Sequence, residues 1–309
     1  MRIEAVGKGS GVFRAIIVLL SLVSAFLSVN GQATQTQIVL LGTGTPYPNP
    51  KAFGPATAVT VGKRVFLFDA GVGVMRQMNA AGLGISGPEA VFITHLHSDH
   101  TLGYPDLILT SWIMRRTWRL PVFGPPGLQS MTDHLLAAFS QDIQIRTRGL
   151  ERLTPGAYRV TVHEIGPGVV YEKDGVRVTA IPVPHGSWKY AFAYRIDTPD
   201  RSILISGDTR PSNALIAAAQ NVDALVHEVY LSNYVRPEDR PGGKFWPQYL
   251  RQFHTSEVEL GRIAARVKPK LLVLTHIIRF GGTDAELLSG IRSAGYTGPI
   301  AIGADLGRY

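Results

Sequence analysis

The sequence of 309 residues contains no cysteine, so no disulfide stabilises the fold and no thiolate can bind a metal. Any metal site must therefore use histidine and carboxylate side chains. No linker-like or low-complexity segment divides the middle of the chain, and no period of about 20–50 residues repeats. A composition of 45% hydrophobic and 17% charged residues is typical of a globular protein. Together with these absences, it favours one large domain.

Acidic residues are scarce relative to basic ones, with 23 Asp and Glu against 31 Lys and Arg and a formal net charge of +8. No run of Lys or Arg is longer than two residues. The balance favours anionic substrates or surfaces, but without basic runs it is not by itself a nucleic-acid signature.

The first 33 residues differ from the rest of the chain. Three basic residues outweigh one Glu, an apolar run covers residues 15–29, and Gly31 and Ala33 have the spacing that signal peptidase prefers. We predict that residues 1–33 are a secretory signal peptide and that residues 34–309 form the mature domain, which is then periplasmic or secreted. The alternative is an uncleaved membrane tether through residues 15–29 that leaves the domain facing outside, although this run is short for a spanning helix.

Potential metal ligands are most concentrated directly after an apolar run, residues 90–93, that reads as a buried strand. Three histidines and an aspartate fall within six residues: His95, His97, Asp99 and His100. Imidazole and carboxylate suit Zn²⁺, Mn²⁺ or Fe²⁺. Residues two apart on a turn can point the same way, so His95 and His97 can hold one ion while the other two turn toward a second. A polar loop with incidental histidines is the alternative, which this density of ligands disfavours.

The order His-Leu-His-Ser-Asp-His resembles the HxHxDH signature of the metallo-β-lactamase superfamily, and the resemblance can be followed from about Gln37 to the C-terminus. It implies an α/β fold of the αββα sandwich type, with a dinuclear metal site on one edge and three further ligands that each follow a strand. Residues in these places are His185, Asp208 and His276, after the expected strands 176–183, 202–205 and 271–274.

By this resemblance, His95, His97 and His185 hold the first ion. Asp99, His100 and His276 hold the second, and Asp208 bridges. Two divalent ions about 3.5–4 Å apart can share a hydroxide and lower its pKa toward neutrality. Zn²⁺ is expected at both positions, and the nitrogen and oxygen ligands are also compatible with Mn²⁺ or Fe²⁺.

Four local motifs resemble the branch of the tRNA 3′-processing endonuclease, tRNase Z, which includes phosphodiesterases and arylsulfatase-like enzymes. They are residues 41–46, 124–127, 206–209 and 227–228. In that branch a Glu and a His outside the metal shell form a proton-shuttling pair, which implies catalytic roles for Glu228 and His254 beside Asp99. A residue that only packs at the start of the helix expected over 257–267 is the alternative for His254.

One part of that branch is missing. A long basic tRNA-binding arm separates the third histidine ligand from the bridging aspartate there, whereas His185 and Asp208 are 23 positions apart here. The sequence therefore predicts an exported dinuclear hydrolase of small anionic esters, phosphodiesters first and aryl sulfates next, with no tRNA partner. A thioester, lactone or β-lactam hydrolase is the alternative enzyme, and a non-catalytic metal-binding protein is the alternative of another class. A homodimer is compatible with either.

Hydrophobic patterning predicts helices over residues 72–81, 257–267 and 284–293, and one from Gly127 to about residue 140. Residues 233–253 read as a long loop rich in Pro and Gly, of the kind that often forms a functional lid.

Overall fold

The computed structural model describes residues 35–309, so the predicted signal peptide, residues 1–33, lies outside the described residues. Within the described part, no helix is long and apolar enough to cross a membrane.

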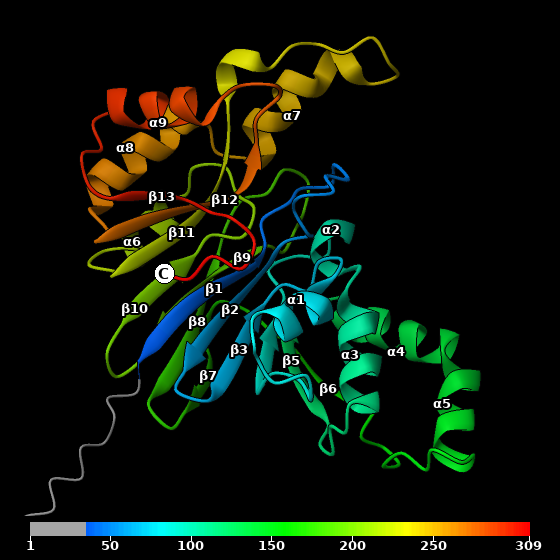
Figure 1. Ribbon diagram of the computed structural model, residues 1–309. Helices are drawn as coiled ribbons and strands as arrows, with labels where there is room; N and C mark the ends of the chain where they lie inside the picture. Colours follow the sequence, from blue (N-terminus) through cyan, green and yellow to red (C-terminus); the bar gives the residue numbers. More distant parts are fainter. Residues whose placement is uncertain (1–34) are drawn as a thin grey trace, which may run out of the picture. The chain divides into compact units, whose positions relative to one another are not determined.

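Two mixed sheets form the centre of the domain (Figure 1). The first has the strand order β1-β2-β3-β4-β5-β6, and the second has the order β13-β12-β11-β10-β9-β8-β7. The strands of the first sheet are β1 Thr36–Gly42, β2 Ala56–Val61, β3 Arg64–Phe68, β4 Ala90–Phe92, β5 Leu120–Gly124 and β6 Val160–Glu164. Those of the second are β7 Gly168–Lys173, β8 Val176–Pro182, β9 Phe192–Asp197, β10 Ser202–Ile205, β11 Ala224–Tyr230, β12 Leu271–Ile278 and β13 Ile300–Ile302.

The hairpin between β2 and β3 shows why the first sheet starts as it does. Val61 pairs with Arg64, so the connection is the two-residue turn Gly62-Lys63. Gly62 has φ +61, a conformation that glycine adopts without a steric penalty.

Helices cover the outer faces of both sheets. Their bounds are α1 Val74–Ala80, α2 Ser98–Thr101, α3 Tyr104–Ile113, α4 Leu128–Ala138, α5 Ser140–Arg148, α6 Asn213–Ala218, α7 Trp246–Phe253, α8 Glu257–Val267 and α9 Asp284–Ser293. Met78, Tyr104 and Leu128, from α1, α3 and α4, pack on the first sheet. Leu215, Leu260 and Leu287, from α6, α8 and α9, pack on the second.

A third apolar cluster fills the space between the sheets. Phe68 and Phe92 of the first sheet pack there with Tyr194 of the second, with ring centroids 5.0 Å apart for Phe68–Phe92 and 5.6 Å apart for Phe92–Tyr194. The layers are therefore helix, sheet, sheet, helix, and the predicted αββα sandwich is confirmed.

Parallel pairing brings the carboxyl ends of several strands to one edge of each sheet. Strands β3 to β6 run parallel, as do β10 to β13. The segments that leave β4, β8 and β10 therefore carry their polar residues to a common edge, where α2 begins.

The expected loop over residues 233–253 is only partly a loop, because its last third is the helix α7. The prolines and glycines pointed to irregular structure, but Pro247 lies in the first turn of α7, where its missing N–H breaks no intrahelical bond. The burial of Leu250 and the stacking of aromatic rings along the helix stabilise it.

His276 was expected after a strand, but it lies inside one, as does Glu228. β11 and β12 extend to Tyr230 and Ile278, and their register shifts between Glu228 and Val229. His276 has φ +45 beside this irregularity. The bulge therefore breaks the pleat at the position of these two polar side chains.

Candidate metal centre

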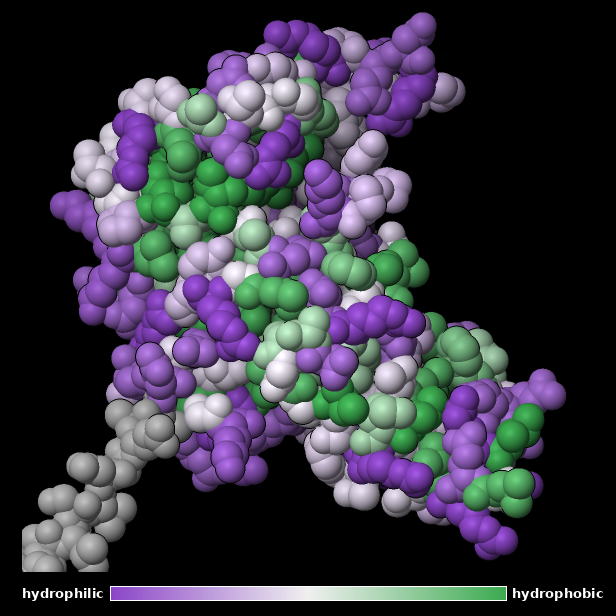
Figure 2. All heavy atoms as spheres, in the orientation of Figure 1, coloured by the Kyte–Doolittle hydropathy of each residue, from purple (hydrophilic) through white to green (hydrophobic). Residues whose placement is uncertain are grey.

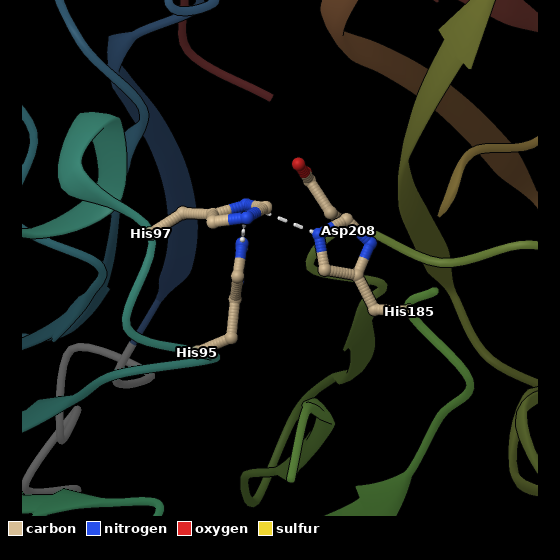
Figure 3. A group of neighbouring side chains, drawn as sticks. All are labelled: His95, His97, His185 and Asp208. Atoms are coloured by element: carbon tan, nitrogen blue, oxygen red, sulfur yellow. Dashed lines mark hydrogen bonds between the residues drawn. The ribbon is translucent and has the colours of Figure 1, made fainter. Parts of the chain in front are cut away.

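The first group of potential ligands joins the two sheets (Figure 3). His95 and His97 follow β4, while His185 and Asp208 follow β8 and β10 of the other sheet. The Nδ1 atom of His97 lies 3.0 Å from Nε2 of His95 and 3.1 Å from Nε2 of His185. One potential ligand atom from each of the four residues lies within 4.8 Å of the others.

Hydrogen bonds behind two of these imidazoles determine where their protons are. His185 Nδ1 lies 2.8 Å from the carbonyl oxygen of Phe253, which can only accept, so this nitrogen carries the proton. His95 Nδ1 lies 3.0 Å from the hydroxyl of Thr94, which itself donates to Asp69. Both Nε2 atoms therefore direct a lone pair toward His97.

Trp188 contacts the imidazole of His97. Its indole N–H donates to His97 Nε2 at 2.6 Å, so in the absence of an ion His97 carries its proton on Nδ1, between the other two lone pairs. Replacing that proton with a cation would leave three nitrogens and a carboxylate around one ion. This donor set fits a divalent metal with nitrogen and oxygen preference.

Burial keeps these imidazoles neutral. It lowers the pKa of His97 and of His185 to about 4 and that of His95 well below its usual value. Since metal binding requires the neutral form, little protonation opposes it near pH 7.

The second group is Asp99, His100 and His276, with Asp208 beside it. His276 Nε2 lies 3.3 Å from Asp99 Oδ2 and 3.5 Å from Asp208 Oδ2. His100 Nε2 lies 3.5 Å and 3.4 Å from the same two atoms. Burial alone would raise the pKa of Asp208, but the facing imidazoles of His276 and His100 hold it well below its usual value. Asp208 thus lies in contact with both groups, as a bridging carboxylate must.

Asp69 is a residue of this centre that sequence reasoning missed. The residue is 5% exposed, and its carboxylate accepts from the Thr94 backbone N–H at 2.8 Å and lies 2.7 Å from His100 Nδ1. It therefore fixes which nitrogen of His100 faces the other ligands. The sequence does carry a signal for it, because Asp69 directly follows the buried strand β3, much as Asp208 follows β10.

The predicted pair lies next to these two groups, and His254 has a ring nitrogen within 4.8 Å of ligand atoms of Asp208 and His276. His254 Nδ1 is 3.2 Å from Glu228 Oε1, which also accepts from the Thr209 backbone N–H at 3.0 Å. Burial raises the pKa of Glu228 well above its usual value and lowers that of His254 to about 4. Both shifts favour the uncharged forms, a protonated Glu228 carboxyl and a neutral His254 imidazole.

A pocket of about 810 Å³ opens over both groups. Five polar side chains from the ligand groups and the shuttle pair line it: His97, Asp99, Asp208, His254 and His276. Its walls are the loop after β1, helix α7 and the end of β12 with the residues that follow. The volume lies within the range of about 300–1,000 Å³ that is typical of sites for whole small ligands.

Comparison with known proteins places these features in a family context. The model of the beta-lactamase superfamily domain matches residues 64–277. A protein called ribonuclease Z from Mycobacterium bovis (strain BCG / Pasteur 1173P2) is 34% identical over 278 residues, which cover 88% of this chain and 97% of that protein. Ribonuclease Z of Mycobacterium tuberculosis (strain ATCC 25618 / H37Rv) is 33% identical over 278 residues.

Solved structures share the fold. The short form of human tRNase Z has a TM-score of 0.66 at 21% identity, covering 88% of this chain and 98% of that one. The metallo-beta-lactamase fold protein YhfI from Bacillus subtilis has the same TM-score at 18% identity, covering 89% and 98%.

The prediction of a hydrolase of small anionic esters without a tRNA partner is wrong, because the relatives that this chain matches over nearly their whole length are ribonucleases. The prediction depended on the missing arm. The alignment is 278 positions long but uses only 88% of this chain, or about 272 residues. The relative therefore has only about six residues within the alignment that this chain lacks. A ribonuclease Z of this size has no long arm either, and its absence therefore cannot exclude tRNA.

Proposed function

We propose that this metal-dependent hydrolase, which belongs to the tRNase Z branch of the metallo-β-lactamase superfamily, is an endoribonuclease with tRNA as its substrate. The observation that carries the proposal is the 34% identity to a ribonuclease Z of which the chain covers 97%. The pocket over clustered imidazoles and carboxylates, with the hydrogen-bonded pair of Glu228 and His254 at its side, supports a phosphodiester as the bond that is broken.

Two sets of side chains would hold the metal ions. His95, His97 and His185 would bind one ion, Asp99, His100 and His276 would bind the other, and Asp208 would contact both. We expect Zn²⁺, which would supply Lewis acidity by polarising the phosphoryl oxygen and acidifying a water molecule. Asp99 would touch the reacting atoms, since it lines the pocket within this second set.

The chain itself supplies the proton for the leaving oxygen. His254 Nδ1 faces Glu228, and the imidazole lines the pocket. With the Glu228 proton directed at Nδ1, the imidazole proton is on Nε2. Nε2–H would donate to the leaving ribose oxygen while Nδ1 takes up the proton of Glu228, so no charge accumulates on the buried pair.

The test is cleavage of a tRNA that carries a 3′ extension by the purified, zinc-loaded protein, with the product ends mapped by gel electrophoresis and mass spectrometry. We expect a single internal cut that is lost in Asp208→Ala and unchanged in His134→Ala, which alters an exposed histidine in α4. Intact RNA after incubation with the metal-loaded, folded protein would refute the proposal.

A further inference from the structure

One wall of the pocket is a ladder of aromatic rings on α7. Trp246, Tyr249 and Phe253 lie on one side of the helix, with centroids 4.9 Å apart for Trp246–Tyr249 and 4.2 Å apart for Tyr249–Phe253, and interplanar angles of 5° and 21°. Trp246 and Tyr249 line the pocket. Because each ring covers the next, the outer face of Trp246 is the end of the ladder.

The cation Arg240 covers that end face. Its guanidinium lies 5.2 Å from the centroid of the Trp246 ring. Among the described residues, its only acidic partner is Glu238, which lies in the same segment between β11 and α7. Both side chains are exposed. Figures 1 and 2 show that this segment projects beside α7 and has a hydrophilic surface.

The opposite wall is the loop after β1, and it carries another aromatic ring. Tyr47 lines the pocket with 76% of its surface exposed. Asp305 anchors the loop, because it accepts from the backbone N–H of Thr43 at 2.9 Å and from that of Phe53 at 2.7 Å. A rigidly held loop therefore presents a free aromatic face to the pocket.

We propose that Tyr47 and the stacked pair of Trp246 and Arg240, whose guanidinium is the outermost plane, form a stacking subsite for nucleobases next to the scissile phosphate. The inference rests on the proposed function and specifies how the same pocket recognises RNA. Aromatic faces and an arginine plane bind bases of any sequence, which suits a site that tolerates sequence variation. The ligand groups lie deep, with His95 fully buried and His100 and Asp208 at most 3% exposed, so these bases enter unpaired.

The test is a cycle of protein and substrate changes with the zinc-loaded protein. RNA substrates carry either a normal nucleotide or an abasic nucleotide immediately 5′ or 3′ of the cut. For the normal substrate, we expect Trp246→Ala to raise KM about 5- to 150-fold with little change in kcat. For the substrate that is abasic at the stacked position, the same variant should leave KM almost unchanged, since there is no base left to stack.

Three further variants separate stacking from folding. Tyr47→Ala alters an exposed ring and should show the same coupling to one of the two abasic positions. Trp246→Phe keeps the ring and should raise KM less than Trp246→Ala. Phe245→Ala, next to Trp246 but outside the pocket and 56% exposed, is the matched control and should behave as wild type.

Equal effects of Trp246→Ala on normal and abasic substrates would overturn the subsite. If the wild-type protein cleaves no RNA, the proposed function fails, and binding of the same oligonucleotides, followed by quenching of tryptophan fluorescence, still decides the subsite. Normal and abasic oligonucleotides that bind equally well would then rule it out.

Discussion

At the scale of single residues, His254 is the side chain whose removal most directly tests the chemistry. If its Nε2–H protonates the leaving oxygen, His254→Ala should slow RNA cleavage by about 10²–10⁴-fold, the usual contribution of a general acid. A nitrophenyl phosphodiester has a leaving group that needs little protonation, so its turnover should fall much less. Both rates are measured by steady-state kinetics.

The zinc content of His254→Ala is the control, and it should stay at the wild-type value because His254 is outside the two proposed ligand sets. Glu228→Gln should give a similar but weaker defect, and the double variant should be no worse than His254→Ala, since both residues act in one step. Equal losses for good and poor leaving groups would argue against the general-acid role.

Asp69 acts on the same centre through His100. Asp69→Asn should weaken metal binding by about 10–100-fold, because it removes the carboxylate that accepts the proton of His100 Nδ1. Competition with a chromogenic chelator measures this affinity. Asp106→Asn, in the surface pair with Arg76, is the control and should have no effect. Unchanged affinity in Asp69→Asn would show that His100 does not need this partner.

At the scale of elements, a polar cluster connects the two sheets. Arg64, at the start of β3, makes two hydrogen bonds of 2.7 Å and 2.9 Å to Glu89, and Tyr171 of β7 donates to the same carboxylate at 2.7 Å. The hydrogen bond from Arg64 is the main reason that the pKa of Glu89 falls to about 2.

The stability that Glu89 contributes should therefore depend on pH. A carboxylate whose pKa is lower in the folded state stabilises the fold above its unfolded value of about 4.5, and this contribution is lost as the pH falls toward 2. With allowance for solvent screening, Glu89→Gln should lower the free energy of unfolding by about 1 kcal/mol at pH 7 and by progressively less below pH 4.5. Urea denaturation across this range tests it, with Glu172→Gln in an exposed pair as the control.

At the scale of the whole molecule, the net charge of +8 should make RNA recognition sensitive to salt. We expect KM for RNA to rise with added KCl, with a slope of about 0.7 in log KM against log[salt] for each phosphate contacted. Arg240→Gln should reduce this slope. A nitrophenyl phosphodiester, with one charge, should show little salt dependence. Identical salt profiles for the two substrates would contradict an electrostatic contribution to RNA binding.

The N-terminal segment gives another prediction at this scale. If residues 1–33 are a signal peptide, mass spectrometry of the protein isolated from its source should place the mature N-terminus near Gln32 or Thr34. An intact chain that begins at Met1 and remains with the membrane fraction would instead favour the tether through residues 15–29.

The sequence by itself determined the features that depend on neighbours along the chain. Helix α8 begins and ends where the pattern predicts, because Ser256 and Glu259 form a capping box within four residues. The seven predicted metal ligands were named from the resemblance to the metallo-β-lactamase superfamily together with their positions at or near the ends of hydrophobic strands.

Only the tertiary structure decided which of these residues meet. His97 and His185 are 88 positions apart and lie 3.1 Å from each other because two sheets pack face to face. Asp69 gained its role from contact with His100, 31 positions away. Trp246 became part of the pocket because α7 formed within an expected loop. Such contacts depend on packing between layers, which local periodicity does not encode. The missing arm was misleading for the same reason, because substrate recognition also depends on the surfaces that packing creates.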